Sequence, residues 1–209
     1  MLLVMARMKK YFITGISTDV GKTIASAILV EALHADYWKP VQAGELENCD
    51  TMKVQRLISN SKSKFHPNNY ALQTPMSPHA AAEIDGIKID IKKIIAPKTN
   101  NHLVIEGAGG LLVPLDSKHT VLDIIKPDYN VIVVSRHYLG SINHTLLTVN
   151  TLKEKGFDVS IIFSGDEHIT TETIIKKMTK VPIIGRIEEE PYFDKNVVQE
   201  YADLFRKNL

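Results

Sequence analysis

The sequence predicts an α/β fold with a mostly parallel central sheet and helices on both of its faces. Three observations predict it. Short, predominantly apolar runs read as strands buried on both faces, and six of them lie at residues 11–13, 37–40, 102–106, 130–134, 159–163 and 181–184. Segments with helical spacing separate these runs, which is the alternation typical of a parallel sheet. The first run also passes through a glycine-containing loop directly into a helix.

The first part of the chain is expected to alternate strand and helix up to residue 59. After the strand over 11–13, apolar residues three and four apart predict a helix over 22–35. Pro40 ends the strand over 37–40, and Gln42, Ala43 and Gly44 are expected to form a loop at its carboxyl end. Asp50 then opens a helix over 51–59, where an acidic residue is favourable.

The stretch over 59–78 is polar and is expected to run over the surface as a long connection. Ser77 is predicted to cap the next helix, with Pro78 at its first position. Another short helical piece is expected over 90–95.

The second part of the chain continues the alternation. A strand over 102–106 ends in an acid and leads into the small-residue turn 107–110. Further helices are expected over 140–155, 170–178 and 195–209, between and after the remaining strands. Ligands of such sheets bind at the carboxyl ends of the strands. Residues just beyond those ends should therefore share one cleft; they are Lys22, Lys39, Glu106 and Gly140.

Composition favours a single domain over 1–209 and excludes several classes of function. With 209 residues and 44% hydrophobic content, the chain can bury one sizeable core. Its net charge of +1 offers no excess of either sign to attract nucleic acid or a membrane surface. The single cysteine, Cys49, cannot form an internal disulfide, which suits the cytoplasm. No run is long enough to span a membrane, and residues 1–8 are expected to be a disordered leader, with Met8 as an alternative start.

Residues 15–23, GISTDVGKT, have the spacing of a phosphate-binding loop. Gly15 and Gly21 allow backbone dihedrals and close approach that a side chain would prevent. Successive amides and the positive end of the following helix can then bind a polyphosphate. Lys22 would reach the outer phosphates, and Thr23 would offer its hydroxyl to Mg²⁺. The sequence therefore predicts a nucleoside triphosphate site.

Two carboxylates are candidates for the magnesium site, because Mg²⁺ prefers oxygen ligands. Glu106 is the better one, since it ends an apolar strand; a plain ion pair with a lysine is the alternative. Asp50 is the second, and helix capping explains it equally well. Eight histidines lack a ligand spacing, so a zinc site is not expected.

Lys39 stands at a strand end that should face the cleft, although a surface lysine is the alternative. Two lysines at one phosphate-binding mouth suggest that a second anion lies beside the triphosphate. The small residues after Glu106, at 107–110, would let the backbone approach a phosphate or a substrate.

Taken together, these blocks resemble the dethiobiotin synthetase family. The similarity runs in order through most of the chain, at residues 11–15, 20–23, 38–41, 50, 77–79, 104–110 and 139–144. The resemblance implies a P-loop NTPase-like fold and an ATP-dependent cyclo-ligase. Such an enzyme converts 7,8-diaminononanoate and CO2, or bicarbonate, to dethiobiotin through a carbamate and a carbamic-phosphoric anhydride, and it releases ADP and phosphate.

The resemblance also implies roles for individual residues. The catalytic residues would be Lys39, Lys22 and Thr18. Those around ATP would be Asp19, Val20, Gly21, Lys22, Thr23, Ile24, Asp50, Glu106, Gly107, Ala108, Gly109 and Glu188. Those around the diamine would be Lys39, Ala43, Gly140, Ser141, Ile142 and Asn143, the last four from the neighbouring subunit of a homodimer. The Mg²⁺ ligands would be Thr23, Asp50 and Glu106.

The chain departs from the family pattern in three places. Gln42 and Ala43 stand where many relatives carry a hydroxyl residue, and segments 163–166 and 188–191 differ near the expected position of the base. Preference for ATP over other triphosphates therefore stays open. A partner-regulated ATPase of the partitioning and division type is the alternative function. Those proteins carry a second lysine after the first glycine of the loop, where this chain has Ile16.

Overall fold

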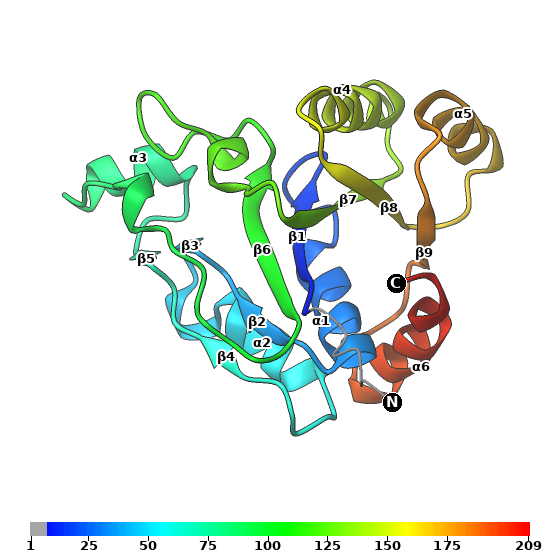
Figure 1. The fold of residues 1–209 in the computed structure, drawn as a ribbon, viewed down its shortest axis with the longest axis horizontal. Helices are drawn as coiled ribbons and strands as arrows, with labels where there is room; N and C mark the ends of the chain where they lie inside the picture. The colour runs from blue at the N-terminus through cyan, green and yellow to red at the C-terminus, as the bar shows by residue number, and fades with distance from the viewer. Residues whose placement is uncertain (1–7) are drawn as a thin grey trace, which may run out of the picture.

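The computed structural model describes residues 8–209, and a seven-stranded sheet forms its centre (Figure 1). The strand order is β4-β2-β6-β1-β7-β8-β9, and every neighbouring pair is parallel. The strands are β1 (Lys10–Gly15), β2 (Asp36–Trp38), β4 (Phe65–His66), β6 (Leu103–Gly110), β7 (Tyr129–Arg136), β8 (Asp158–Ser164) and β9 (Ile183–Ile187). The predicted α/β class with a parallel sheet is confirmed.

Helices cover both faces of this sheet (Figure 1). One face carries α1 (Lys22–Leu33), α2 (Asp50–Leu57) and α6 (Lys195–Phe205). The other carries α3 (Pro78–Ile84), α4 (Ser141–Glu154) and α5 (Ile169–Thr179). Short 3-10 turns lie at η1 (Leu46–Asn48), η2 (Ile91–Lys93), η3 (Val121–Ile124) and η4 (Arg206–Asn208). None of the helices within residues 8–209 is long and apolar enough to cross a bilayer.

The core has two parts because successive strand residues point to opposite faces of the sheet. In β1, Phe12 packs in the cluster that contains α4 and α5, whereas Tyr11 and Ile13 pack in the cluster that contains α1 and α6. Both faces are dry, so the strands are apolar throughout rather than alternating with polar residues. This explains why continuous apolar runs marked the strands in the sequence.

Two predictions about the first part of the chain are wrong. Residues 42–44 were expected to form a loop, but 41–43 form β3 (Val41–Ala43), which pairs in parallel with β5 (Tyr70–Leu72). The stretch 59–78 was expected to be a surface connection, but it contains β5 and also β4, which forms one edge of the main sheet. These strands have only two or three residues, too few to give a recognisable apolar pattern. They are held by backbone pairing that composition does not reveal.

Other boundaries also differ from the prediction. The turn expected over 107–110 is strand, since β6 continues to Gly110 and pairs it with Gly15 of β1. Strand β9 runs through Gly185, where a Cβ would lie 2.3 Å from the Phe205 ring, so this glycine lets α6 pack against the strand. Pro78 does begin α3, but the Ser77 hydroxyl makes no capping hydrogen bond. The leader predicted over 1–8 lies, except for Met8, outside the described residues.

Candidate active site

A cleft of about 1250 Å³ lies beside the phosphate-binding loop and the carboxyl end of β6. The predicted site residues that line it are Thr18, Asp19, Gly21, Lys22, Thr23, Ile24, Lys39, Ala43, Asp50, Glu106, Ala108 and Gly109. The predicted residues that do not line it are Val20, Gly107, Gly140, Ser141, Ile142, Asn143 and Glu188. Lys22, Lys39 and Glu106 therefore share one cleft as expected, whereas Gly140 of the same chain does not.

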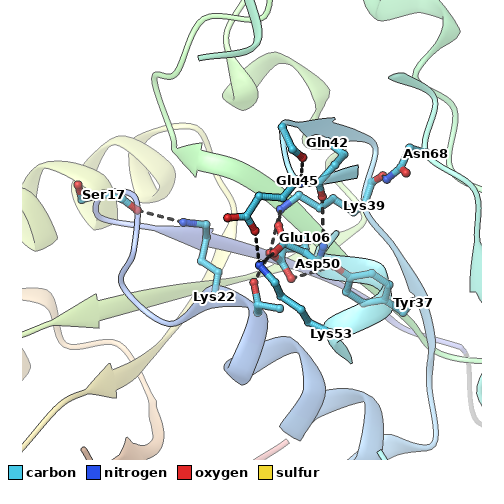
Figure 2. A network of polar contacts seen from close by, with 12 residues as sticks. Ser17, Lys22, Tyr37, Lys39, Gln42, Glu45, Asp50, Lys53, Asn68 and Glu106 are labelled. Atoms are coloured by element: carbon cyan, nitrogen blue, oxygen red, sulfur yellow. Dashed lines mark hydrogen bonds and ion pairs between the residues drawn. The ribbon is translucent and has the colours of Figure 1, made fainter. Parts of the chain in front are cut away.

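The phosphate-binding loop connects β1 to α1. A Cβ on Gly15 would lie 2.6 Å from both Ser17 O and a Val20 methyl group, so this turn requires glycine. Gly21 caps α1 with φ +91°, and no side chain caps the helix, which leaves its first amides available to an anion. Lys22 donates a hydrogen bond of 3.1 Å to Ser17 O (Figure 2). Burial lowers the pKa of Lys22, and the Lys39 charge lowers it further.

Lys39 follows β2 directly and is buried between two carboxylates (Figure 2). Its Nζ lies 3.0 Å from Glu106 Oε1 and also contacts Asp50 Oδ2. Burial alone would lower the pKa of Lys39, but the Glu106 and Asp50 charges outweigh it and raise that pKa. Burial likewise opposes ionisation of Asp50, yet Lys39 lowers the Asp50 pKa. Lys39 is therefore a buried lysine paired with carboxylates, and the alternative of a surface lysine is wrong.

Glu106 receives hydrogen bonds on both carboxylate oxygens and is 1% exposed. Oε1 accepts from the Thr23 hydroxyl at 3.0 Å and from Lys39, and Oε2 accepts from the Tyr37 hydroxyl at 2.9 Å. The ion pair with a lysine is therefore present, and the same carboxylate also contacts the threonine of the phosphate-binding loop. The role of Glu106 as a magnesium ligand stays a prediction.

The oxygen atoms of Thr23, Asp50 and Glu106 fit a magnesium ion bound together with a nucleotide. Mg²⁺ is usually held by one or two carboxylates plus substrate phosphates and water, rather than by a complete protein cage. The described part of the chain holds no group of three or more His, Cys, Asp and Glu side chains arranged for a metal. The candidate donors are hard oxygen atoms, which Mg²⁺ prefers.

Three residues that sequence reasoning did not select support this centre. Tyr37 binds Glu106, and the Asn68 amide donates to Lys39 O at 2.6 Å. Gln42 Oε1 accepts from the Asp50 backbone N–H at 3.4 Å, at the start of a helix that lacks a side-chain cap of its own. Gln42 was noted only as standing where many relatives carry a hydroxyl residue. Its side chain instead joins β3 to α2, and Asp50 is the first residue of that helix rather than its cap.

The region predicted to hold the base is occupied by ion pairs. Glu188 accepts a hydrogen bond of 2.8 Å from Arg186 Nε, so its carboxylate is already paired. Arg136, which lines the cleft, donates to Glu189 at 2.9 Å. Both carboxylates in this region are therefore paired with arginines.

The amino end of α4 presents apolar side chains to solvent. Gly140 caps the helix with φ +98°, Ser141 is buried, and Leu139 is fully exposed. Ile142 and Leu147 of the same helix are also exposed. None of residues 140–143 lines the cleft of its own chain.

The fold and the site together define a P-loop nucleoside triphosphate-binding protein. A parallel sheet, a glycine loop capping α1, and an acid within the neighbouring strand β6 are the features of this class. A family model described as an AAA domain matches residues 9–197. Among solved structures, a plasmid partition protein from Borrelia burgdorferi is similar with a TM-score of 0.61 at 14% identity, over 97% of this chain and 98% of that one. A ParA family ATPase from Chlorobium tepidum is similar with a TM-score of 0.55 at 13% identity, over 96% and 91%. These likenesses confirm the fold.

Sequence relatives identify the family within that class. An ATP-dependent dethiobiotin synthetase from Christiangramia forsetii is 65% identical over 96% of this chain and 98% of its own. Another from Cytophaga hutchinsonii is 50% identical over 93% and 96%, and one from Chlamydia pneumoniae is 42% identical over 96% and 90%. The chain belongs to the ATP-dependent dethiobiotin synthetase family.

Proposed function

We propose that this protein is an ATP-dependent cyclo-ligase that forms dethiobiotin from 7,8-diaminononanoate, CO2 and ATP. One structural observation supports it most directly: Lys39 is buried beside Glu106 in the cleft that also holds Lys22 and Thr23. A nucleotide-binding site alone has no need of this second lysine. The names of the relatives agree with the proposal.

The reaction brings two anions together, and the cleft is suited to that. One amine of the substrate attacks CO2, loses a proton and becomes a carbamate. A carbamate oxygen then attacks the γ-phosphorus, and ADP leaves. The second amine attacks the carbonyl carbon of the resulting anhydride, the cyclic urea forms, and phosphate leaves. Such transfer depends on positioning and charge neutralisation rather than on covalent help from the protein.

The side chains divide this work. Lys22 and the loop amides bind the triphosphate, while Lys39 stabilises the carbamate and its phosphorylated form. Thr18 belongs to the phosphate-binding loop and lines the cleft, where it would contact the transferred group or the substrate. Thr23, Asp50 and Glu106 would hold Mg²⁺, which neutralises phosphate charge when it is bound. Lys39 would then give up part of its contact with Asp50 and Glu106 and bind the carbamate instead.

We also propose that the protein is a homodimer and that it works in the cytoplasm. The exposed apolar side chains around Gly140 would be covered in a homodimer, and the helix amides at 140–143 would bind the diamine's carboxylate in the partner's cleft. Analytical ultracentrifugation should give twice the chain mass. A monomer with full activity would contradict the shared site.

The test of the activity is a substrate-dependence assay. Purified protein with MgATP should release ADP and phosphate only when both 7,8-diaminononanoate and bicarbonate are present, and dethiobiotin should appear in equal amount by mass spectrometry. An ATPase rate that does not change when 7,8-diaminononanoate is added would favour the partitioning-type alternative. That alternative shares the fold at 13–14% identity, whereas the synthetases match the sequence at 42–65%.

Lys39→Ala provides the matching residue-level test. Turnover should fall strongly while the affinity for ATP is nearly unchanged, because Lys39 does not belong to the phosphate-binding loop. Lost ATP affinity instead would mean that Lys39 binds the nucleotide rather than the carbamate.

A further inference from the structure

The Tyr37 side chain is completely buried, yet its hydroxyl group reaches the candidate metal site. The residue is 0% exposed, and its ring lies in the core on the α1 face, 5.9 Å from the Phe65 ring. The hydroxyl of a buried tyrosine needs a hydrogen-bond partner. Here the partner is Glu106 Oε2, at 2.9 Å.

Strand register explains why these two groups meet. β2 and β6 are parallel neighbours, and Tyr37 pairs with Val104. Side chains two residues apart share a face of the sheet, so Glu106 lies on the same face as Val104 and Tyr37. Lys39, two residues after Tyr37, reaches the same carboxylate (Figure 2). Tyr37 on β2 and Lys39 directly after it thus donate hydrogen bonds to the two carboxylate oxygens of Glu106.

The hydrogen bonds from Tyr37 and Lys39 determine which oxygen of Glu106 faces the phosphate-binding loop. The terminal torsion of a glutamate is broad and has no strong preference of its own. With Oε2 bound to Tyr37, Oε1 is directed at Lys39 and at the Thr23 hydroxyl, 3.0 Å away.

We propose that Tyr37 is a positioning residue, whose hydroxyl orients Glu106 and thereby sets how tightly the cleft holds the divalent metal ion of a metal–nucleotide complex. The inference rests on the proposed function, in which Glu106 is a metal ligand. Without the hydroxyl, Oε2 is left unpaired in a dry site, and the carboxylate is free to turn away from Thr23. Outer partners of this kind typically change metal affinity by about 10- to 100-fold.

The test uses Tyr37→Phe, which removes a single oxygen atom. Mn²⁺ serves as the probe, and its binding to the full-length protein in the presence of ADP is followed by the EPR signal of free Mn²⁺. We expect the variant to bind Mn²⁺ about tenfold more weakly, while its affinity for ADP in EDTA stays unchanged. In the synthetase assay, the Mg²⁺ concentration for half-maximal turnover should rise by a similar factor, and saturating Mg²⁺ should restore most of the rate.

Thr99→Val is the matched control. It removes a hydroxyl that donates to another buried carboxylate, Asp36 Oδ2, at 2.7 Å and at the other end of β2. This variant should lose stability in urea, yet keep the Mn²⁺ affinity of the unaltered protein. The comparison separates a lost buried hydrogen bond from a disturbed metal site.

Two results would overturn the inference. Unchanged Mn²⁺ affinity in Tyr37→Phe would show that Glu106 does not depend on the hydroxyl. Equal weakening of ADP binding with and without Mn²⁺ would show that Tyr37 only supports the cleft as a whole. Failure of the proposed function would look different: dethiobiotin would not form, although the Mn²⁺ measurements would still give the predicted difference.

Discussion

Replacing Lys39 with methionine should destabilise the protein markedly at neutral pH. The substitution keeps most of the side chain's length but leaves Glu106 and Asp50 as neighbouring buried carboxylates without their ammonium group. Removing one partner of a buried ion pair typically costs about 3–5 kcal/mol. For a chain of this length, that lowers the melting temperature by roughly 10 °C. Urea unfolding followed by circular dichroism, in EDTA and without nucleotide, measures the difference directly.

The pH dependence of this difference has a definite sign. Lys39 lowers the pKa of Asp50, so the pair stabilises the folded state above the unfolded-state pKa of Asp50, about 3.9, and this stability is lost as the pH falls through the folded-state value. The variant lacks that contribution at every pH. The difference in free energy of unfolding between the unaltered protein and Lys39→Met should therefore be largest near pH 7 and should decrease below pH ~4.

Lys53→Met is the control for the Lys39 substitution. Lys53 also faces Asp50, at 3.7 Å, but its side chain is 32% exposed and its closer contact is Glu45. Exposed pairs contribute at most about 1 kcal/mol, so this variant should unfold almost like the unaltered protein. Equal stabilities of Lys39→Met and Lys53→Met at pH 7, or a gap that widens in acid, would refute the electrostatic account of the site.

Three further substitutions test other parts of the structure. Lys22→Ala should weaken ATP binding by roughly 10- to 100-fold, measured by calorimetry, since a charge-assisted contact is lost; unchanged affinity would contradict the assignment of the loop. Gly44→Ala should cost roughly 1–3 kcal/mol in urea, because φ is +73° and the new Cβ would lie 2.5 Å from Pro75; a neutral effect would argue against that turn. Glu31→Gln should cost about 1–3 kcal/mol, because the buried carboxylate accepts backbone hydrogen bonds from Ser59 and Asn60 at 2.9 and 3.1 Å. Although burial opposes it, those hydrogen bonds lower the Glu31 pKa, so the difference should vanish as the pH falls below about 4.

Much of the fold could be predicted from the sequence, because both faces of the sheet are covered. Long apolar strands such as β6 and β7 stand out when neither face meets water. The phosphate-binding loop and the acid after an apolar run could also be recognised, since spacing along the chain determines them. These features locate Lys22, Thr23 and Glu106 at one edge of the sheet before any coordinates are known.

The remainder depends on pairing between distant segments. β3 and β5 are three residues each, and their parallel pairing joins positions that are far apart in the chain. Tyr37 was missed because an aromatic residue in an apolar run is normally core, and its ring is indeed core. A signal was present in the equal spacing of Tyr37 and Lys39 along one predicted strand and of Val104 and Glu106 along the next. It becomes informative only when the two strands are known to be neighbours in register.

The hydrogen bond from Asn68 to the carbonyl of Lys39 gives the long connection between α2 and α3 an unexpected constraint. That segment also supplies the outermost strand β4 and the partner of β3, so it is fastened at several points around the buried ammonium group. Insertions or deletions there would not behave like length changes in an ordinary surface loop. They would shift the peptide that carries Lys39. We expect such a shift to lower the turnover rate more than it lowers the free energy of unfolding.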